Sequence, residues 1–249
     1  MGIFEQYKDR YEAHKEEEFT IQEFLEICKN DPKSYANSAE RLLNAIGTPQ
    51  MVDTSQDPAL SRIFSNRVIA RYPAFAEFYG MEEAIEQIVS YLKHAAQGLE
   101  EKKQVLYLLG PVGGGKSSLA ERLKELMQNN PIYVLKGSPV NDHPFSLFDA
   151  NEDGHILASE FGISKRYLKT IMSPWARKRL HEFNGDITQF KVVRLHPSIL
   201  DQIAIAKTEP GDENNQDIST LVGKVDIRRL EDFAQNDPDA YSYSGSLCK

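Results

Sequence analysis

The stretch of sequence that decides the fold is Gly110-Pro111-Val112-Gly113-Gly114-Gly115-Lys116-Ser117. It satisfies the pattern G-x-x-x-x-G-K-[ST] at every fixed position. Glycines let the chain curl so closely around an anion that several backbone N–H groups point at it. A helix that begins at the end of such a loop adds the positive end of its dipole. The loop therefore predicts a site for the phosphates of a nucleotide.

The side chains at the end of the loop have distinct expected roles. Lys116 can reach the β- and γ-phosphates as a mobile point charge, and it is the candidate catalytic residue. Ser117 can bind Mg²⁺ through its hydroxyl, and it is the candidate metal ligand. The expected cofactors are ATP and Mg²⁺. The residues expected to contact ATP from the loop are Gly110, Pro111, Val112, Gly113, Gly114, Gly115, Lys116, Ser117 and Ser118.

The residues around the loop follow the pattern of a βα unit. Residues 104–109 form a short apolar run that predicts a buried strand, and residues 117–127 place leucines on one face of a helix. Residues 132–135 predict a second buried strand. Strand, loop, helix and strand in this order indicate a parallel pair with a right-handed crossover. The expected fold is α/β, a P-loop NTPase parallel sheet with helices, preceded by a helical N-terminal region.

The expected helical N-terminal region covers residues 1–79, and the nucleotide-binding domain covers residues 80–249. Thr20 and Glu23 form a capping box at the start of one helix. Further helices are expected at residues 35–46, 60–69 and 81–97. The rest of the second domain is expected to contain a helix at 173–183, strands at 190–195 and 203–206, a polar loop at 208–215 and a helix at 221–234.

A second candidate site element lies one helix upstream of the loop, at Phe78-Tyr79-Gly80. This turn resembles the segment of AAA+ proteins in which an apolar pair and a glycine precede the helix leading to the P-loop strand. The resemblance implies that Tyr79 and Gly80 pack against adenine. The alternative is an aromatic pair that belongs to the hydrophobic core.

Two other patterns have alternative explanations. Asp149-Ala150-Asn151-Glu152-Asp153-Gly154 with Glu160 has the spacing of an EF-hand calcium loop, but Pro144 leaves no room for an entering helix, so a polar loop is expected. A basic stretch could supply an arginine finger to a neighbouring subunit, or it could be a solvated helix face. Its members are Lys165, Arg166, Lys169, Arg177, Lys178 and Arg179.

Composition narrows the class of protein. The net charge of −8 over 249 residues argues against nucleic acid as a main partner. No apolar run approaches the ~20 residues of a membrane helix, and the charged N-terminus is not a signal peptide, so a soluble protein without a membrane partner is expected. Cys28 and Cys248 lie in no metal-binding or redox pattern, so both are expected to be reduced thiols.

The chain closely resembles the PrkA-type serine protein kinases of bacteria. The likeness is carried by residues 64–73, 79–118, 138–144, 172–175 and 206–217. The resemblance implies a cytoplasmic, stress-related protein with an N-terminal AAA+ domain and a C-terminal kinase-related region. Members are considerably longer, and we find no acidic strand end after Lys136, so the Mg²⁺-orienting acidic strand is expected beyond Lys249.

Three functions fit these residues. The resemblance implies a kinase that transfers the γ-phosphoryl group of ATP to serine or threonine hydroxyls of a protein substrate, although the usual HRD, DFG and V-A-I-K kinase motifs are absent. An AAA+ ATPase that remodels or degrades proteins would use the same loop residues. An ATP-gated interaction module would bind ATP without turnover. AAA+ proteins usually form rings, so a homo-oligomer is also expected from the resemblance.

Overall fold

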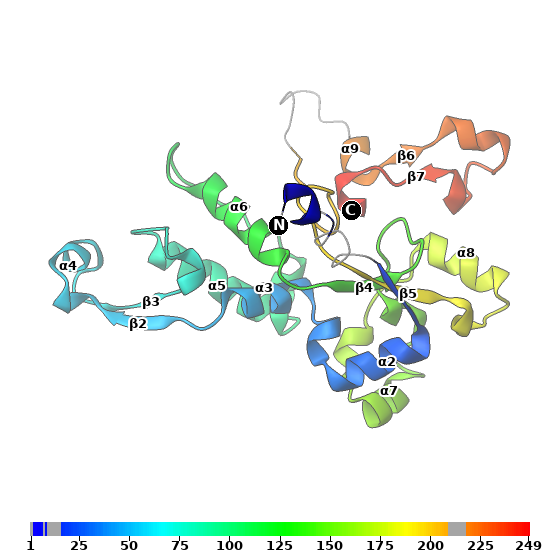
Figure 1. The fold of residues 1–249 in the computed structure, drawn as a ribbon, viewed down its shortest axis with the longest axis horizontal. Coiled ribbons are helices and arrows are strands. Elements are labelled where there is room, and N and C mark those ends of the chain that lie inside the picture. Colours follow the sequence, from blue (N-terminus) through cyan, green and yellow to red (C-terminus); the bar gives the residue numbers. More distant parts are fainter. Residues whose placement is uncertain (1, 7, 9–15, 209–217) are drawn as a thin grey trace. The chain divides into compact units, whose positions relative to one another are not determined.

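The computed structural model describes residues 2–6, 8, 16–208 and 218–249, and it divides into two compact units. The first unit comprises Met1–Tyr35 and Pro131–Lys249, and the second comprises Ala36–Asn130. Figure 1 shows the elements of both units in sequence colours. The predicted boundary between residues 79 and 80 coincides with neither limit of the second unit, and it stays a prediction.

A three-stranded antiparallel sheet lies at the centre of the first unit. Its order is β1 (Glu17–Thr20), β5 (Lys191–Leu195) and β4 (Ile132–Leu135). Figure 1 shows α2 (Ile21–Asn30) close to these strands and α7 (Gly154–Phe161) beside α2. The core is built from side chains of the sheet, the helices and the loops between them, among them Phe24, Leu135, Phe145, Ile163, Leu168 and Val192.

Local hydrogen bonds explain where the helices of this unit begin. The Thr20 hydroxyl accepts from the Glu23 N–H at 3.2 Å, while the Glu23 carboxylate accepts from the Thr20 N–H at 2.7 Å, which confirms the capping box. Ser173 caps α8 (Pro174–Glu182), with proline at the first helical position. The carboxylate of the buried Asp142 accepts from the hydroxyls of Ser138 at 2.8 Å and Ser173 at 2.6 Å, so it ties α8 to the loop after β4.

Two predictions for the end of the chain are wrong. Instead of a helix at 221–234, the structure has α9 (Ser219–Val222), β6 (Lys224–Val225) and a 3₁₀ turn, because Gly223 has a φ of +85° and β6 pairs with β7 (Tyr241–Ser242). Instead of a strand at 203–206, only an isolated bridge joins Ser198 to Ile203. The polar loop expected at 208–215 lies almost entirely outside the described residues.

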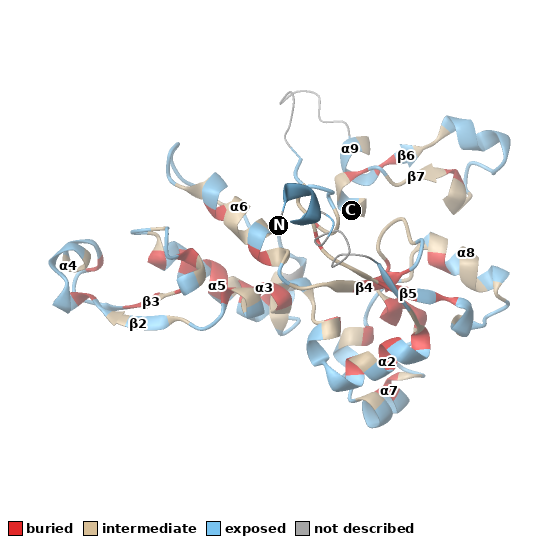
Figure 2. Cartoon of the chain, viewed as in Figure 1, coloured by how far each residue is buried: buried red, intermediate tan, exposed pale blue. Residues whose placement is uncertain are grey.

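Three helices form the core of the second unit: α3 (Ser38–Ile46), α5 (Glu82–Ala96) and α6 (Lys116–Met127). Figure 2 shows buried residues recurring along each of them. Gly47 ends α3 with a φ of +76°, as its place in the sequence predicts. The shared core contains Leu42, Ile46, Phe75, Ile85, Ile88, Val89, Leu92, Leu119 and Leu126.

A hairpin replaces part of the helix predicted at 60–69. The helix α4 (Pro58–Phe64) stops because Ser65 and Asn66 both have positive φ, and the chain then turns into β3 (Val68–Arg71). This strand pairs antiparallel with β2 (Gln50–Asp53). Together with β1, these strands show that residues 1–79 are not purely helical.

The strand predicted at 104–109 does not form. No hydrogen bond joins the backbone of residues 105–109 to any described residue, and Val105, Tyr107 and Leu109 are 90, 79 and 84% exposed. Leu108, on the opposite face, packs against the helical core. The predicted partner, β4, pairs antiparallel with β5. All described strand pairs are antiparallel, so the expected parallel sheet is not found in this part of the protein.

Two smaller expectations concern membranes and cysteines. Among the helices that the structure describes, none combines the length and the apolar character needed to cross a bilayer. Cys28 and Cys248 are both free thiols, as expected. Cys28 lies in the core of the first unit, where burial raises its pKa to about 12.

Candidate functional site

The glycine-rich loop ends where α6 begins, as the sequence predicts. Gly115 is the N-cap residue of α6 and has a φ of +73°, and Gly113 has a φ of +80°. Both values lie in the left-handed region that glycine adopts without steric cost. The first-turn N–H groups of a helix have no intrahelical partner, so those of α6 are free to bind an anion at this end.

The lysine of the loop is held by the loop itself. The Lys116 ammonium donates to the carbonyl of Gly110 at 2.8 Å and to that of Pro111 at 2.5 Å. Ser117 and Ser118 follow it in the first turn of α6, and both are exposed. Ammonium, hydroxyls and first-turn amides thus gather at one end of one helix.

The aromatic turn and the glycines of the loop line one cleft. The cleft measures about 800 Å³ and lies within the second unit. Its lining includes Phe78 and Tyr79 from the turn and Gly113, Gly114, Gly115 and Ser118 from the loop and α6. Two regions that the sequence analysis treated as parts of one site therefore meet in the structure.

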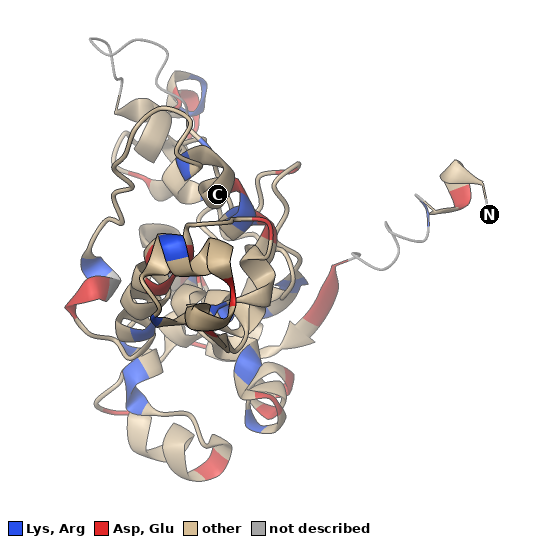
Figure 3. Cartoon of the chain, turned by 90° about the vertical axis from the view of Figure 1, so that its left-hand side faces the viewer, with Lys and Arg blue, Asp and Glu red and all other residues tan. Residues whose placement is uncertain are grey.

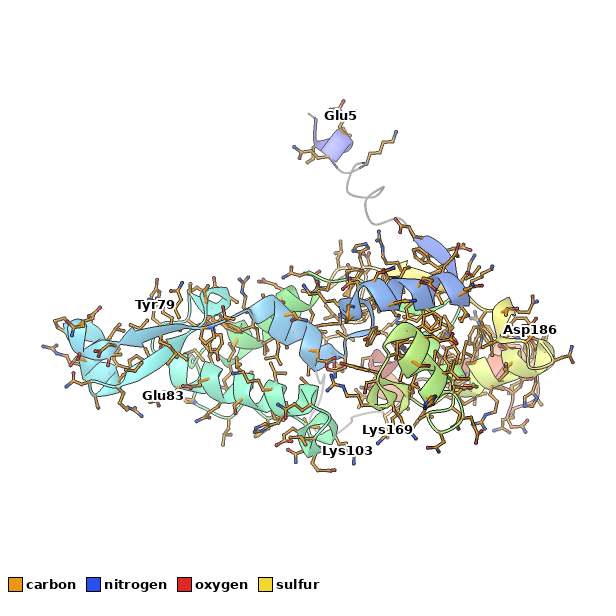
Figure 4. All side chains as sticks on the ribbon, turned by 90° about the horizontal axis from the view of Figure 1, so that it is seen from below. Glu5, Tyr79, Glu83, Lys103, Lys169 and Asp186 are labelled. Carbon is orange, nitrogen blue, oxygen red and sulfur yellow. The ribbon has the colours of Figure 1, made fainter. Side chains whose placement is uncertain are left out.

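The two aromatic residues of the turn play different roles. Phe78 is half-buried and its ring packs edge-on against Phe75, with centroids 6.0 Å apart. Tyr79 is 78% exposed, and the Arg71 guanidinium lies 5.7 Å from its ring centroid. Phe78 therefore packs against the core while also lining the cleft, and Tyr79, labelled in Figure 4, is exposed with Arg71 over its ring.

The remaining loop positions lie beside the cleft. Gly110, Pro111 and Lys116 line a second cavity of about 320 Å³ that also contacts residues 106–109. Val112 is fully exposed at the tip of the loop. Gly80 precedes α5 with a φ of +77° and does not line either cavity.

The geometry fits a nucleotide with its metal. A side chain at Gly115 would place its Cβ 2.8 Å from the Met81 sulfur, and one at Gly114 would place its Cβ 3.1 Å from the Pro111 carbonyl oxygen. The loop is therefore packed so closely at these two positions that glycine fits best. No group of His, Cys, Asp and Glu suited to a metal occurs among the described residues. Ser117 would give Mg²⁺ one hydroxyl ligand, and the phosphates of the nucleotide would supply others.

Sequence reasoning missed five residues that line the cleft: Met81, Arg122 and the carboxylates Glu77, Glu121 and Glu125. Met81 is the N-cap residue of α5, and its sulfur faces Gly115. Arg122 lies on the same face of α6 as Ser118, at a spacing of i+4. That spacing is the signal that could have revealed Arg122.

The calcium-like stretch is a capped polar loop. The Asp149 carboxylate accepts from the N–H groups of Asn151 and Glu152, and these bonds hold the Asp149 pKa below its usual value. The Lys165 ammonium donates to the Asn151 side chain at 2.9 Å. The Lys165 ammonium thus binds the Asn151 side-chain oxygen, which would be a ligand in a calcium loop. This contact agrees with the polar-loop interpretation.

Part of the basic stretch is neutralised within the first unit. Lys178 donates to the carboxylates of Asp237 and Asp239, and Arg179 binds Asp239 and Glu182. Arg177 is exposed, and its role as an arginine finger stays a prediction. Figure 3 shows Lys and Arg segments interspersed with Asp and Glu segments along the ribbon.

Comparison with known proteins places this geometry in a family. The model of the PrkA AAA domain matches residues 19–249. Serine/threonine kinase YeaG of Escherichia coli strain K12 is 76% identical over the whole chain, and ATP-dependent protease PrkA of Bacillus subtilis strain 168 is 31% identical over 98% of it. The chain spans 39% and 38% of their lengths. No solved structure matches. The chain therefore belongs to the PrkA AAA domain family.

Proposed function

We propose that this chain is the ATP-binding region of a protein serine/threonine kinase. The observation that carries the proposal is the cleft shared by the glycine loop and the Tyr79 turn. It offers an anion-binding end formed by first-turn amides and an aromatic end suited to adenine. The name of the Escherichia coli relative, at 76% identity, supports the kinase reaction.

In this proposal the chain's own residues bind and orient ATP. The residues proposed to contact its phosphates are Gly110, Pro111, Val112, Gly113, Gly114, Gly115, Lys116, Ser117 and Ser118. Tyr79 and Gly80 lie on the adenine side. When ATP binds, the Lys116 ammonium leaves the carbonyl oxygens of Gly110 and Pro111 and donates to phosphate oxygens instead. There it stabilises the charge that develops during phosphoryl transfer. Ser117 would hold Mg²⁺ through its hydroxyl, and the ion would supply positive charge that offsets the negative charge of the phosphates.

We further propose that residues 104–109 form a strand of the expected parallel sheet in the full-length protein. The backbone groups of residues 105–109 pair with no described residue, and the exposed side of this segment is apolar. Unpaired backbone beside an apolar face is the usual template for strand addition. The proposed setting is a cytoplasmic homo-oligomer that acts on a protein substrate, with no role for nucleic acid or membrane.

A second function is favoured by one finding. The Bacillus subtilis relative is named an ATP-dependent protease, and every loop residue would serve ATP hydrolysis equally well. The difference between the two reactions lies in the phosphoryl acceptor: a protein hydroxyl in the kinase, water in the protease.

The test uses full-length protein, γ-labelled ATP and a casein-like substrate. Label on the protein supports the kinase, whereas free phosphate with shortened substrate supports the protease. Lys116→Ala is expected to lower either activity at least about 100-fold, since it removes a cation that stabilises transition-state charge. Lys103→Ala is the matched control, because Lys103, labelled in Figure 4, is exposed and forms an ion pair with the exposed Glu100. Unchanged ATP affinity and activity in Lys116→Ala would contradict the proposed site.

A further inference from the structure

Arg122 joins the P-loop helix to the segment that carries the aromatic turn. Its Nε donates to the carbonyl oxygen of Ala74 at 2.8 Å and lies 3.8 Å from the Glu77 carboxylate. Its Nη1 donates to the Glu125 carboxylate at 2.9 Å, one turn further along α6. The side chain is 32% exposed. The Arg122 guanidinium therefore binds the Ala74 carbonyl through one nitrogen, while the Glu125 carboxylate binds another nitrogen and orients the guanidinium.

The segment that Arg122 holds is continuous with the base side of the cleft. Ala74 and Glu77 flank the buried Phe75, whose ring packs against Phe78. The turn is attached to α6 at two points. Met81 contacts Gly115 beside the phosphate loop, and Arg122 contacts Ala74 further along the helix. Met81, Gly115 and Arg122 all line the same cleft.

The spacing between the two ends of the cleft matters for a nucleotide but not for a phosphate chain alone. A nucleotide links its base to its phosphates through one ribose, so both ends of the site must be held at a matching distance. Fixing that distance before binding saves the entropy that ordering the turn would cost. Lysine cannot reproduce this contact, because its ammonium lacks the rigid fork of guanidinium donors.

We propose that Arg122 is a positioning residue that sets the distance between the base-binding turn and the phosphate loop. The site therefore favours a nucleoside triphosphate over a bare triphosphate. This inference rests on the proposed function, since it assigns a residue to the same cleft. Arg122 does not touch the phosphates in this role, so its loss affects the base side selectively.

The test is calorimetric titration of the full-length protein with Mg²⁺–ATP and, separately, with Mg²⁺–tripolyphosphate. Arg122→Met keeps an unbranched apolar stem and is expected to weaken ATP binding about tenfold, which corresponds to the loss of one charge-assisted hydrogen bond. Tripolyphosphate binding should stay within about twofold. Arg122→Lys is expected to give a similar selective loss, because the fork geometry is absent. Arg62→Met, on the exposed face of α4, is the matched control.

The outcomes separate this inference from the proposed function. If Lys116→Ala weakens both ligands while the Arg122 variants weaken ATP alone, both ideas hold. An equal loss of both ligands in Arg122→Lys at an unchanged melting temperature would overturn the positioning role, as would unaltered ATP binding in both Arg122 variants. Failure of the wild-type protein to bind either ligand would overturn the proposed function, and the inference with it.

Discussion

Alanine substitution at Gly113 and Gly115 tests whether the curl of the loop creates the phosphate site. Both glycines have left-handed φ values, +80° and +73°. An L-residue in that region costs about 1–2 kcal/mol. If only the curled loop binds phosphate, the apparent affinity falls with the fraction of molecules that keep this conformation. Gly113→Ala, whose Cβ would meet nothing within 4 Å, should therefore lower ATP affinity by about 5- to 30-fold.

Gly115→Ala should have a larger effect than Gly113→Ala. Besides the same backbone cost, its Cβ would lie 2.8 Å from the Met81 sulfur, so the thioether must move. Methionine is flexible, and part of this second cost should disappear when its side chain is removed. The double variant Gly115→Ala/Met81→Ala should therefore return toward the affinity of Gly113→Ala.

The assay is calorimetric titration of Mg²⁺–ATP into each full-length variant, with melting temperatures as a check on folding. Wild-type affinity in Gly113→Ala would refute the claim that left-handed backbone at this position forms the site. Equal affinities in Gly115→Ala and the double variant would refute the contact between Met81 and Gly115 as the added cause.

Two further predictions concern the unpaired apolar segment and a buried histidine. In the full-length protein, the amide hydrogens of residues 105–109 should exchange with solvent about 100-fold more slowly than in the isolated 249-residue chain. The reason is that strand pairing raises the free energy of local opening by about 3 kcal/mol. Equal exchange rates would contradict the proposed strand. Burial lowers the pKa of His143 to about 4. The unfolded chain therefore binds a proton that the folded chain excludes between about pH 6.5 and 4, and stability should fall by about 3 kcal/mol as pH drops through this window. His143→Gln should flatten that part of a urea-unfolding pH series, and an unchanged slope would show that His143 is not the group responsible.

The site was predictable where it depends on neighbours in the chain. The loop pattern predicted a helix that begins at the end of the loop, at Ser117, and the structure begins α6 one residue earlier, at Lys116, because this start follows from backbone geometry within a few residues. Arg122 and Met81 were missed, since their roles depend on contacts between helices far apart in sequence, such as the bond from Arg122 to Ala74.

The sequence by itself determined several helix starts and stops and the turn of the glycine-rich loop into α6. The Thr20 capping box, the Gly47 stop and the Ser173-Pro174 start each depend on hydrogen bonds or dihedral angles within about four residues. Only the tertiary structure decided which strands pair. The apolar runs at 104–109 and 132–135 look alike as sequence, yet one is unpaired and the other joins β5 in a sheet that brings Glu17 opposite Arg194. An apolar run shows that a segment needs burial, but its hydrogen-bond partners come from distant parts of the chain, and local sequence does not specify them.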